Sequence, residues 1–177
     1  RRWRDARLRN APRSADELVV EVTDPLALTA AELVALADRC ARANMAVYRC
    51  RSGAAGKDIT REIGRQFGLM NLDANWLADE DGISCIAVSD RSDGRGGFIP
   101  YTDRAIRWHT DGYYHPAERQ IRSMILHCAR PADQGGENAL LDHEIAYIAL
   151  RDASPRHIHA LMAPDAMTIP ERCDEHG

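Results

Sequence analysis

Segments with helical periodicity and segments rich in strand-forming residues occupy separate stretches of this chain, which favours a mixed fold of helices and strands. A T-x-x-E capping box predicts the start of a helix over Ala30–Ala43, and the alternating residues 45–50 predict a strand. We expect a second helix after them, with Asp58 as its cap and Gly68 at its end. Helices therefore precede most of the sheet.

The later part of the chain repeats this mixture with the strands first. Residues 83–88 (ISCIAV) and 121–128 (IRSMILHC) combine β-branched residues with apolar runs, which predicts two strands. Asp142 is expected to cap a helix that continues through Arg151, and Ser154 with the proline after it to start another. The class predicted is α+β.

Charge and hydropathy exclude several classes of function. The net charge of -4 gives no overall electrostatic reason to bind nucleic acid, and no apolar run is long enough for a membrane span. Five widely spaced cysteines without a secretory signal favour a reduced, cytoplasmic protein. The arginine-rich opening, RRWRDARLRN, is interpreted as a solvated leader or as an arm for an acidic partner.

The triplet His109-Thr110-Asp111 is the pattern with most chemical content. On a strand, side-chain direction repeats every two residues, so both side chains are expected on one side, within reach of one metal ion. A histidine, a carboxylate and one further histidine form the facial triad of non-haem iron(II) oxygenases. Seven histidines make H-x-D triplets common by chance, and a structural histidine is the ordinary alternative.

The residues around the triplet make it specific. The segment WHTDG is preceded by Ile99-Pro100-Tyr101, and is followed by a predicted strand ending in Leu126-His127-Cys128 and by the run GGENALLD over residues 135–142. This order resembles the TauD/TfdA family of iron(II)- and 2-oxoglutarate-dependent dioxygenases, which includes taurine dioxygenase. The resemblance is specific over residues 99–142.

The resemblance implies roles for individual residues. His109 and Asp111 are expected to bind iron(II), and Asn138 to hydrogen-bond the co-substrate 2-oxoglutarate, where the family more often has threonine. The alternative for Asn138 is a turn asparagine with a left-handed backbone. Tyr101, Tyr113 and Tyr114 are expected to line a pocket for a small-molecule substrate or, alternatively, to serve in packing.

The family also implies the architecture. The expected fold is a double-stranded β-helix, or jelly roll, with flanking helices and an incomplete C-terminal end. The chain is read as one partial dioxygenase domain over residues 1–177. Within it we expect a leader over 1–28, a layer of helices and a strand over 29–70, and the jelly-roll core with a helical insertion over 83–177.

Two elements of the family's site are expected after Gly177: the second iron-binding histidine and the arginine for the co-substrate carboxylate. The expected activity is hydroxylation of an unactivated C–H bond by O2. The alternatives are a non-catalytic partial jelly roll that binds a partner or oligomerises, and a cupin-like metal enzyme. A jelly roll without its last strands would expose sheet edges, so a homo-oligomer is expected for this chain. The substrate stays open.

An acidic stretch precedes the triplet in the sequence. It lacks the D-x-D-x-D-G pattern of a calcium-binding loop and is interpreted as a solvated surface loop. Its members are Asp73, Asp79, Glu80 and Asp81.

Overall fold

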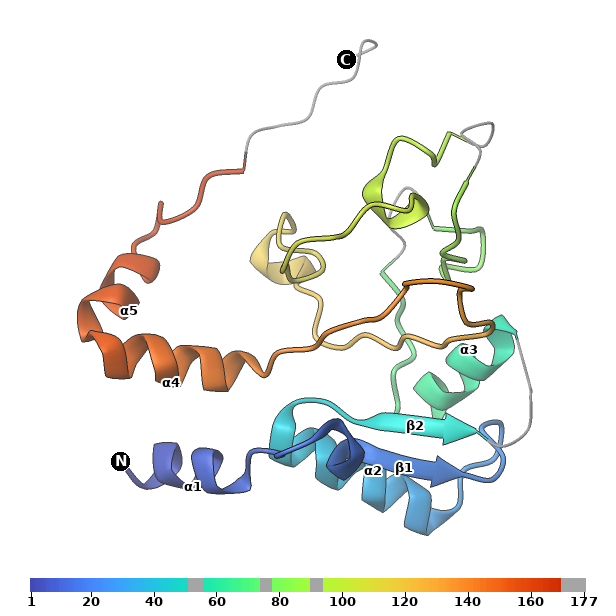
Figure 1. Cartoon of the computed structure of the whole chain (residues 1–177), viewed down its shortest axis with the longest axis horizontal. Coiled ribbons are helices and arrows are strands. Elements are labelled where there is room, and N and C mark those ends of the chain that lie inside the picture. The colour runs from blue at the N-terminus through green and yellow to red at the C-terminus, as the bar shows by residue number, and fades with distance from the viewer. Residues whose placement is uncertain (51–55, 74–77, 90–93, 170–177) are drawn as a thin grey trace. The chain divides into compact units, whose positions relative to one another are not determined.

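The computed structural model describes residues 1–50, 56–73, 78–89 and 94–169 (Figure 1). The chain forms two compact units. The first unit joins residues 1–54 to residues 130–177, and the second unit spans residues 55–129. The predicted α+β class is confirmed, because both helices and a small sheet are present.

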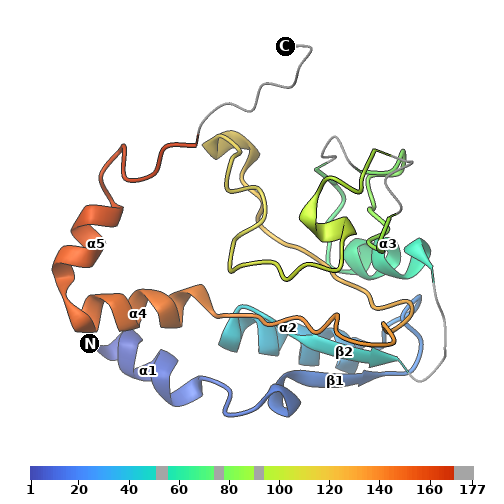
Figure 2. The same ribbon diagram turned by 45° about the horizontal axis from the view of Figure 1, so that its top comes forward.

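The first unit holds most of the regular structure. Its elements are α1 (Arg2–Asn10), the 3-10 helix η1 (Ala15–Leu18), β1 (Val19–Val22), α2 (Ala30–Ala43), β2 (Val47–Cys50), α4 (His143–Ala153) and α5 (Pro155–Leu161). The second unit contains α3 (Lys57–Gln66) and two short 3-10 helices, η2 (Ile99–Tyr101) and η3 (Ala117–Arg119). Figure 2 shows α1 next to α4 in the first unit, and residues of the two helices are in contact.

The sheet consists of β1 and β2, which run parallel with Val19 opposite Val47. Parallel neighbours need a crossover connection, and α2 supplies it between the two strands (Figure 1). Val20 and Val22 of β1 pack with Leu36 of α2 in the core of this unit. Sequence reasoning missed β1, which lies among the residues assigned to the leader.

The helix predicted over Ala30–Ala43 is confirmed with both its ends. The Thr29 hydroxyl accepts a hydrogen bond from the Glu32 backbone N–H, and the Glu32 carboxylate accepts one from the Thr29 backbone, so the capping box is complete. Asn44 ends the helix in the left-handed conformation, at a φ of 57°. The strand predicted over residues 45–50 is also confirmed, as β2.

The two C-terminal helices follow their predicted caps. The Asp142 side chain accepts from the backbone N–H of Glu144 at the start of α4, and the Ser154 hydroxyl accepts from that of Arg156 at the start of α5. In α3, by contrast, the cap is Gly56 and not Asp58, whose side chain is almost fully exposed and pairs with Arg61.

Three strand predictions in the second unit are wrong for this structure. Residues 83–88 and 121–128, and the triplet His109-Thr110-Asp111 that was expected on a strand, are all described, and none of them forms a strand. A strand is maintained by ladder hydrogen bonds to a neighbour, and strand-forming residues alone do not provide that neighbour. Accordingly, the described residues contain a two-stranded sheet and no jelly roll.

In the part of the chain that the structure describes, none of the helices is long and apolar enough to cross a bilayer. The four cysteines within that part, Cys40, Cys50, Cys85 and Cys128, are all free thiols.

Candidate functional site

His109 and Asp111 lie together in the second unit although they are not on a strand. The distance between His109 Nε2 and Asp111 Oδ1 is 3.5 Å. Both side chains are about half exposed, at 45% and 49%. The expected proximity is therefore present, but it arises from an irregular segment that enters a turn at Asp111.

The tautomer of His109 follows from its backbone partner. His109 Nδ1 lies 2.8 Å from the carbonyl oxygen of Arg107. A carbonyl only accepts, so Nδ1 carries the hydrogen and donates it. In the neutral ring Nε2 then presents a lone pair towards the carboxylate of Asp111. A backbone carbonyl that fixes the tautomer in this way is typical of metal-binding histidines.

These two donor atoms fit one divalent metal ion. Nitrogen and oxygen ligands lie about 2.1 Å from a first-row metal, so two of them on one ion are at most about 4.2 Å apart. The separation of 3.5 Å satisfies this limit. Among the described residues there is no group of three or more His, Cys, Asp and Glu side chains that could hold a metal. Within that part of the chain, His109 and Asp111 therefore form a pair of potential ligands without a third side chain of these types beside them.

The turn after Asp111 depends on glycine. Gly112 has a φ of 65°, in the left-handed region that favours glycine. A Cβ atom at this position would lie 2.4 Å from Ile121 Cγ1 and 2.8 Å from His115 Cδ2. The His115 backbone N–H closes the turn by donating to Gly112 O at 2.9 Å. His115 therefore lies at the end of this turn.

His115 is tied to the acidic stretch. Its Nε2 lies 2.9 Å from Asp73 Oδ2, and the other oxygen of Asp73 accepts from Arg119 at 2.6 Å. The hydrogen bond from Arg119 lowers the pKa of Asp73, with a smaller contribution from His115. Because its Nε2 is engaged with Asp73, His115 is a poor candidate for a third ligand beside His109 and Asp111.

Asp79 and Asp81 are also paired, and the interpretation of the acidic stretch as a solvated surface loop did not anticipate the ion pairs of these two residues or of Asp73. Lys57 binds both carboxylates, Arg95 binds Asp79, and Arg61 binds Asp81. The hydrogen bonds from Lys57 and Arg95 lower the pKa of Asp79 to about 2. The lysine and arginines of α3 and the arginine after Gly94 are the sequence features that could have indicated these ion pairs. The sequence alone, however, does not show which cation pairs with which carboxylate.

The remaining predicted site residues have mixed environments. Tyr101 is buried at 4% exposure beneath the guanidinium of Arg95, whereas Tyr113 and Tyr114 are about half exposed and contact each other edge to face. Asn138 belongs to the first unit, where its amide Nδ2 donates to Gly136 O at 3.3 Å. Its own backbone is not left-handed; Gly135 and Gly136 are. The roles of these residues in binding substrate or co-substrate stay predictions.

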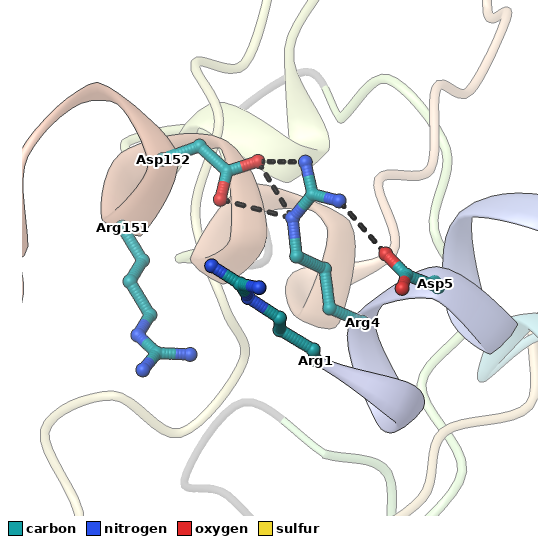
Figure 3. Close-up of a pocket in the computed structure, with 5 residues that line it drawn as sticks. All are labelled: Arg1, Arg4, Asp5, Arg151 and Asp152. Atoms are coloured by element: carbon teal, nitrogen blue, oxygen red, sulfur yellow. Dashed lines mark hydrogen bonds and ion pairs between the residues drawn. The ribbon is translucent and has the colours of Figure 1, made fainter.

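A separate hollow of about 320 Å³ lies between α1 and the end of α4 in the first unit (Figure 3). Its lining residues are Arg1, Arg4, Asp5, Arg151 and Asp152. Arg4 Nε donates to both oxygens of Asp152, at 3.0 and 2.9 Å, and its Nη1 donates to Asp5 at 3.0 Å. None of the predicted site residues lines this hollow. The pair between Arg4 and Asp152 joins the two helices at this hollow.

Comparison with known protein families gave one relevant match. The model of the family described as "Taurine catabolism dioxygenase TauD, TfdA family" matches residues 21–176. No curated protein and no solved structure matched the chain. The matched range covers most of the chain and includes His109, Asp111 and Asn138. The chain therefore belongs to the TauD/TfdA family, whose members include dioxygenases.

Proposed function

We propose that this protein is an iron(II)- and 2-oxoglutarate-dependent oxygenase in which His109 and Asp111 are two of the iron ligands. The observation that carries the proposal is the convergence of His109 Nε2 and Asp111 Oδ1 at 3.5 Å, with the tautomer of His109 fixed by Arg107. Family membership supports the choice of iron and 2-oxoglutarate over other cofactors. The family's double-stranded β-helix is the fold that we propose for the whole site.

The chain's own residues have defined parts in this proposal. The Arg107 carbonyl holds the proton of His109 on Nδ1, so Nε2 offers its lone pair. Asp111 adds a negative charge beside it, and the half-exposed position of both groups leaves an open side for small molecules. When bound, iron(II) with 2-oxoglutarate supplies the oxidising power for hydroxylation of a C–H bond.

Other residues are assigned with the same proposal. The side-chain amide of Asn138 is proposed to donate to the distal carboxylate of 2-oxoglutarate, which a planar amide can do as a threonine hydroxyl does. Tyr113 and Tyr114 are proposed to contact the substrate, because their exposed rings directly follow Asp111. Tyr101 is proposed to support the same pocket from its buried position.

The test is an anaerobic titration of iron(II) into the protein in the presence of 2-oxoglutarate. The expected result is the weak visible charge-transfer band of the chelated co-substrate. His109→Ala is expected to abolish the band, because it removes the only side chain that shares the metal with Asp111 in the described geometry. His159→Ala is the matched control: it removes an exposed histidine of α5 and is expected to retain the band.

A second candidate function is a non-catalytic module that associates with another copy of the chain. The observation that favours it is the exposure of large apolar side chains in the second unit. Each is more than half exposed: Ile86, Val88, Trp108, Met124 and Leu126. Absence of the charge-transfer band together with self-association in sedimentation velocity would favour this candidate. A band that survives His109→Ala would overturn the assignment of the ligands.

A further inference from the structure

The imidazole of His115 packs against Gly112 in the turn that directly follows Asp111. Gly112 and His115 approach so closely that a Cβ on the glycine would lie 2.8 Å from His115 Cδ2. The backbone of His115 donates to Gly112 O across the same turn. The orientation of Asp111, which directly precedes Gly112, is thus linked to the position of the His115 ring.

The His115 ring is fixed from several directions. Asp73 binds its Nε2 at 2.9 Å, and the ring of Tyr114 packs against it edge to face with 4.7 Å between centroids. Only 9% of the His115 side chain is exposed, whereas His109 and Asp111 nearby are half exposed. A nearly buried imidazole with a carboxylate partner has little freedom to change rotamer.

Asp73 is itself held in place from outside the turn. Arg119, which ends η3, donates to Asp73 Oδ1 at 2.6 Å and is half exposed. Its charge keeps the pKa of Asp73 below the ordinary value, so the carboxylate is ionised when His115 binds it. A chain of contacts therefore runs from Arg119 through Asp73 and His115 to Gly112.

We propose that Asp73 and His115 are positioning residues of the metal site, which hold the Gly112–His115 turn and thereby orient the Asp111 carboxylate. This inference rests on the proposed function of Asp111 as a ligand. Neither residue needs to touch the metal or the substrate. Residues that orient a metal ligand without binding the metal themselves typically change metal affinity by roughly 10- to 100-fold when they are replaced.

The experiment compares iron(II) affinity and amide hydrogen exchange in Asp73→Asn with those of the unaltered protein. The substitution preserves shape but removes the charge that binds His115. We expect roughly tenfold weaker iron(II) binding in the presence of 2-oxoglutarate. We also expect faster exchange at the His115 amide, which closes the turn, and unchanged exchange at the Phe67 amide, which donates to Ile63 at the end of α3.

Two further variants keep the test decisive. Asp58→Asn removes an exposed carboxylate of the same unit and is expected to change neither readout. Arg119→Gln removes the half-exposed arginine that binds Asp73. If Asp73→Asn does not fold, this variant tests the inference in its place. We expect it to weaken iron(II) binding in the same direction and by a smaller factor.

The outcomes separate this inference from the proposed function. Unchanged iron(II) affinity in Asp73→Asn, or in Arg119→Gln where the first variant does not fold, overturns the inference even if stability falls. If the unaltered protein binds no iron(II), the proposed function fails. In that case, faster exchange confined to the His115 amide in Asp73→Asn still supports the conclusion that Asp73 and His115 hold the turn. Unchanged exchange at that amide overturns this conclusion.

Discussion

Gly112 is the residue on which the candidate site depends most sharply. Its φ of 65° and the two side chains that surround its Cα exclude any other residue without rearrangement. Because it directly follows Asp111, a change of backbone here moves a proposed ligand. Gly97 offers a contrast in the same unit, since a Cβ there would meet nothing within 4 Å and its φ is not in the left-handed region.

Gly112→Ala is accordingly expected to lower the free energy of unfolding by about 1–3 kcal/mol, the usual cost of a non-glycine residue in a strained conformation. Urea denaturation measures it. Gly97→Ala is the matched control and is expected to be neutral or slightly stabilising, because alanine reduces the entropy of the unfolded chain. Equal stability of the two variants would contradict the turn geometry described for Asp111 and Gly112.

At the scale of the elements, α2 is held at its start by the carboxylate of Glu32. This carboxylate accepts hydrogen bonds from the backbone N–H of Thr23 at 2.8 Å and of Thr29 at 2.7 Å, and from the Thr29 hydroxyl. Led by the bond from Thr23, these contacts lower the pKa of Glu32 from 4.5 to about 2. Glu32 therefore ties β1 to the helix that follows it.

The pH dependence follows from this shift. A carboxylate whose pKa is lowered by folding stabilises the protein fully above its unfolded pKa of 4.5, and loses that contribution as the pH falls towards 2. Glu32→Gln retains only one acceptor oxygen, so we expect it to be less stable than the unaltered protein at neutral pH. The difference should disappear between these two pKa values. Chemical denaturation at a series of pH values measures it, and a difference that does not vary with pH would refute the assignment to Glu32.

At the scale of the whole molecule, Arg7 joins parts of the first unit that are far apart in sequence. Its guanidinium donates to the carbonyls of Ala41 and Arg42 at the end of α2, and to Asp142 at the start of α4. It also pairs with Glu144. Arg7 and Asp142 are largely buried, at 12% and 8% exposure. Neither interpretation of the arginine-rich opening anticipates these contacts.

Arg7→Ala is expected to lower the free energy of unfolding by about 3 kcal/mol, because it leaves a buried carboxylate without its cation. The exposed pair between Arg49 and Glu21 provides the control. Arg49→Ala in that pair is expected to cost less than about 1 kcal/mol. Thermal or urea unfolding of both variants tests the comparison, and similar costs would show that the buried position of Arg7 contributes nothing.

Local features of this protein follow directly from its amino-acid sequence. Ala30–Ala43 and the caps at Asp142 and Ser154 were predictable, because capping and helical periodicity depend on residues within a few positions of one another. The proximity of His109 and Asp111 was also expected, but from a strand; it is present in an irregular segment, where the two residues are separated by one position.

Contacts between residues far apart in the chain become known from the three-dimensional fold alone. The strands expected over residues 83–88 and 121–128 required neighbours that the local sequence does not specify, and they are absent from the described second unit. In the same way, Asp73 was assigned to a solvated loop because nothing within its own segment points to His115, 42 residues away. The path of the whole chain determines which oppositely charged side chains come close enough to pair, and the charge of each residue alone does not determine its partner.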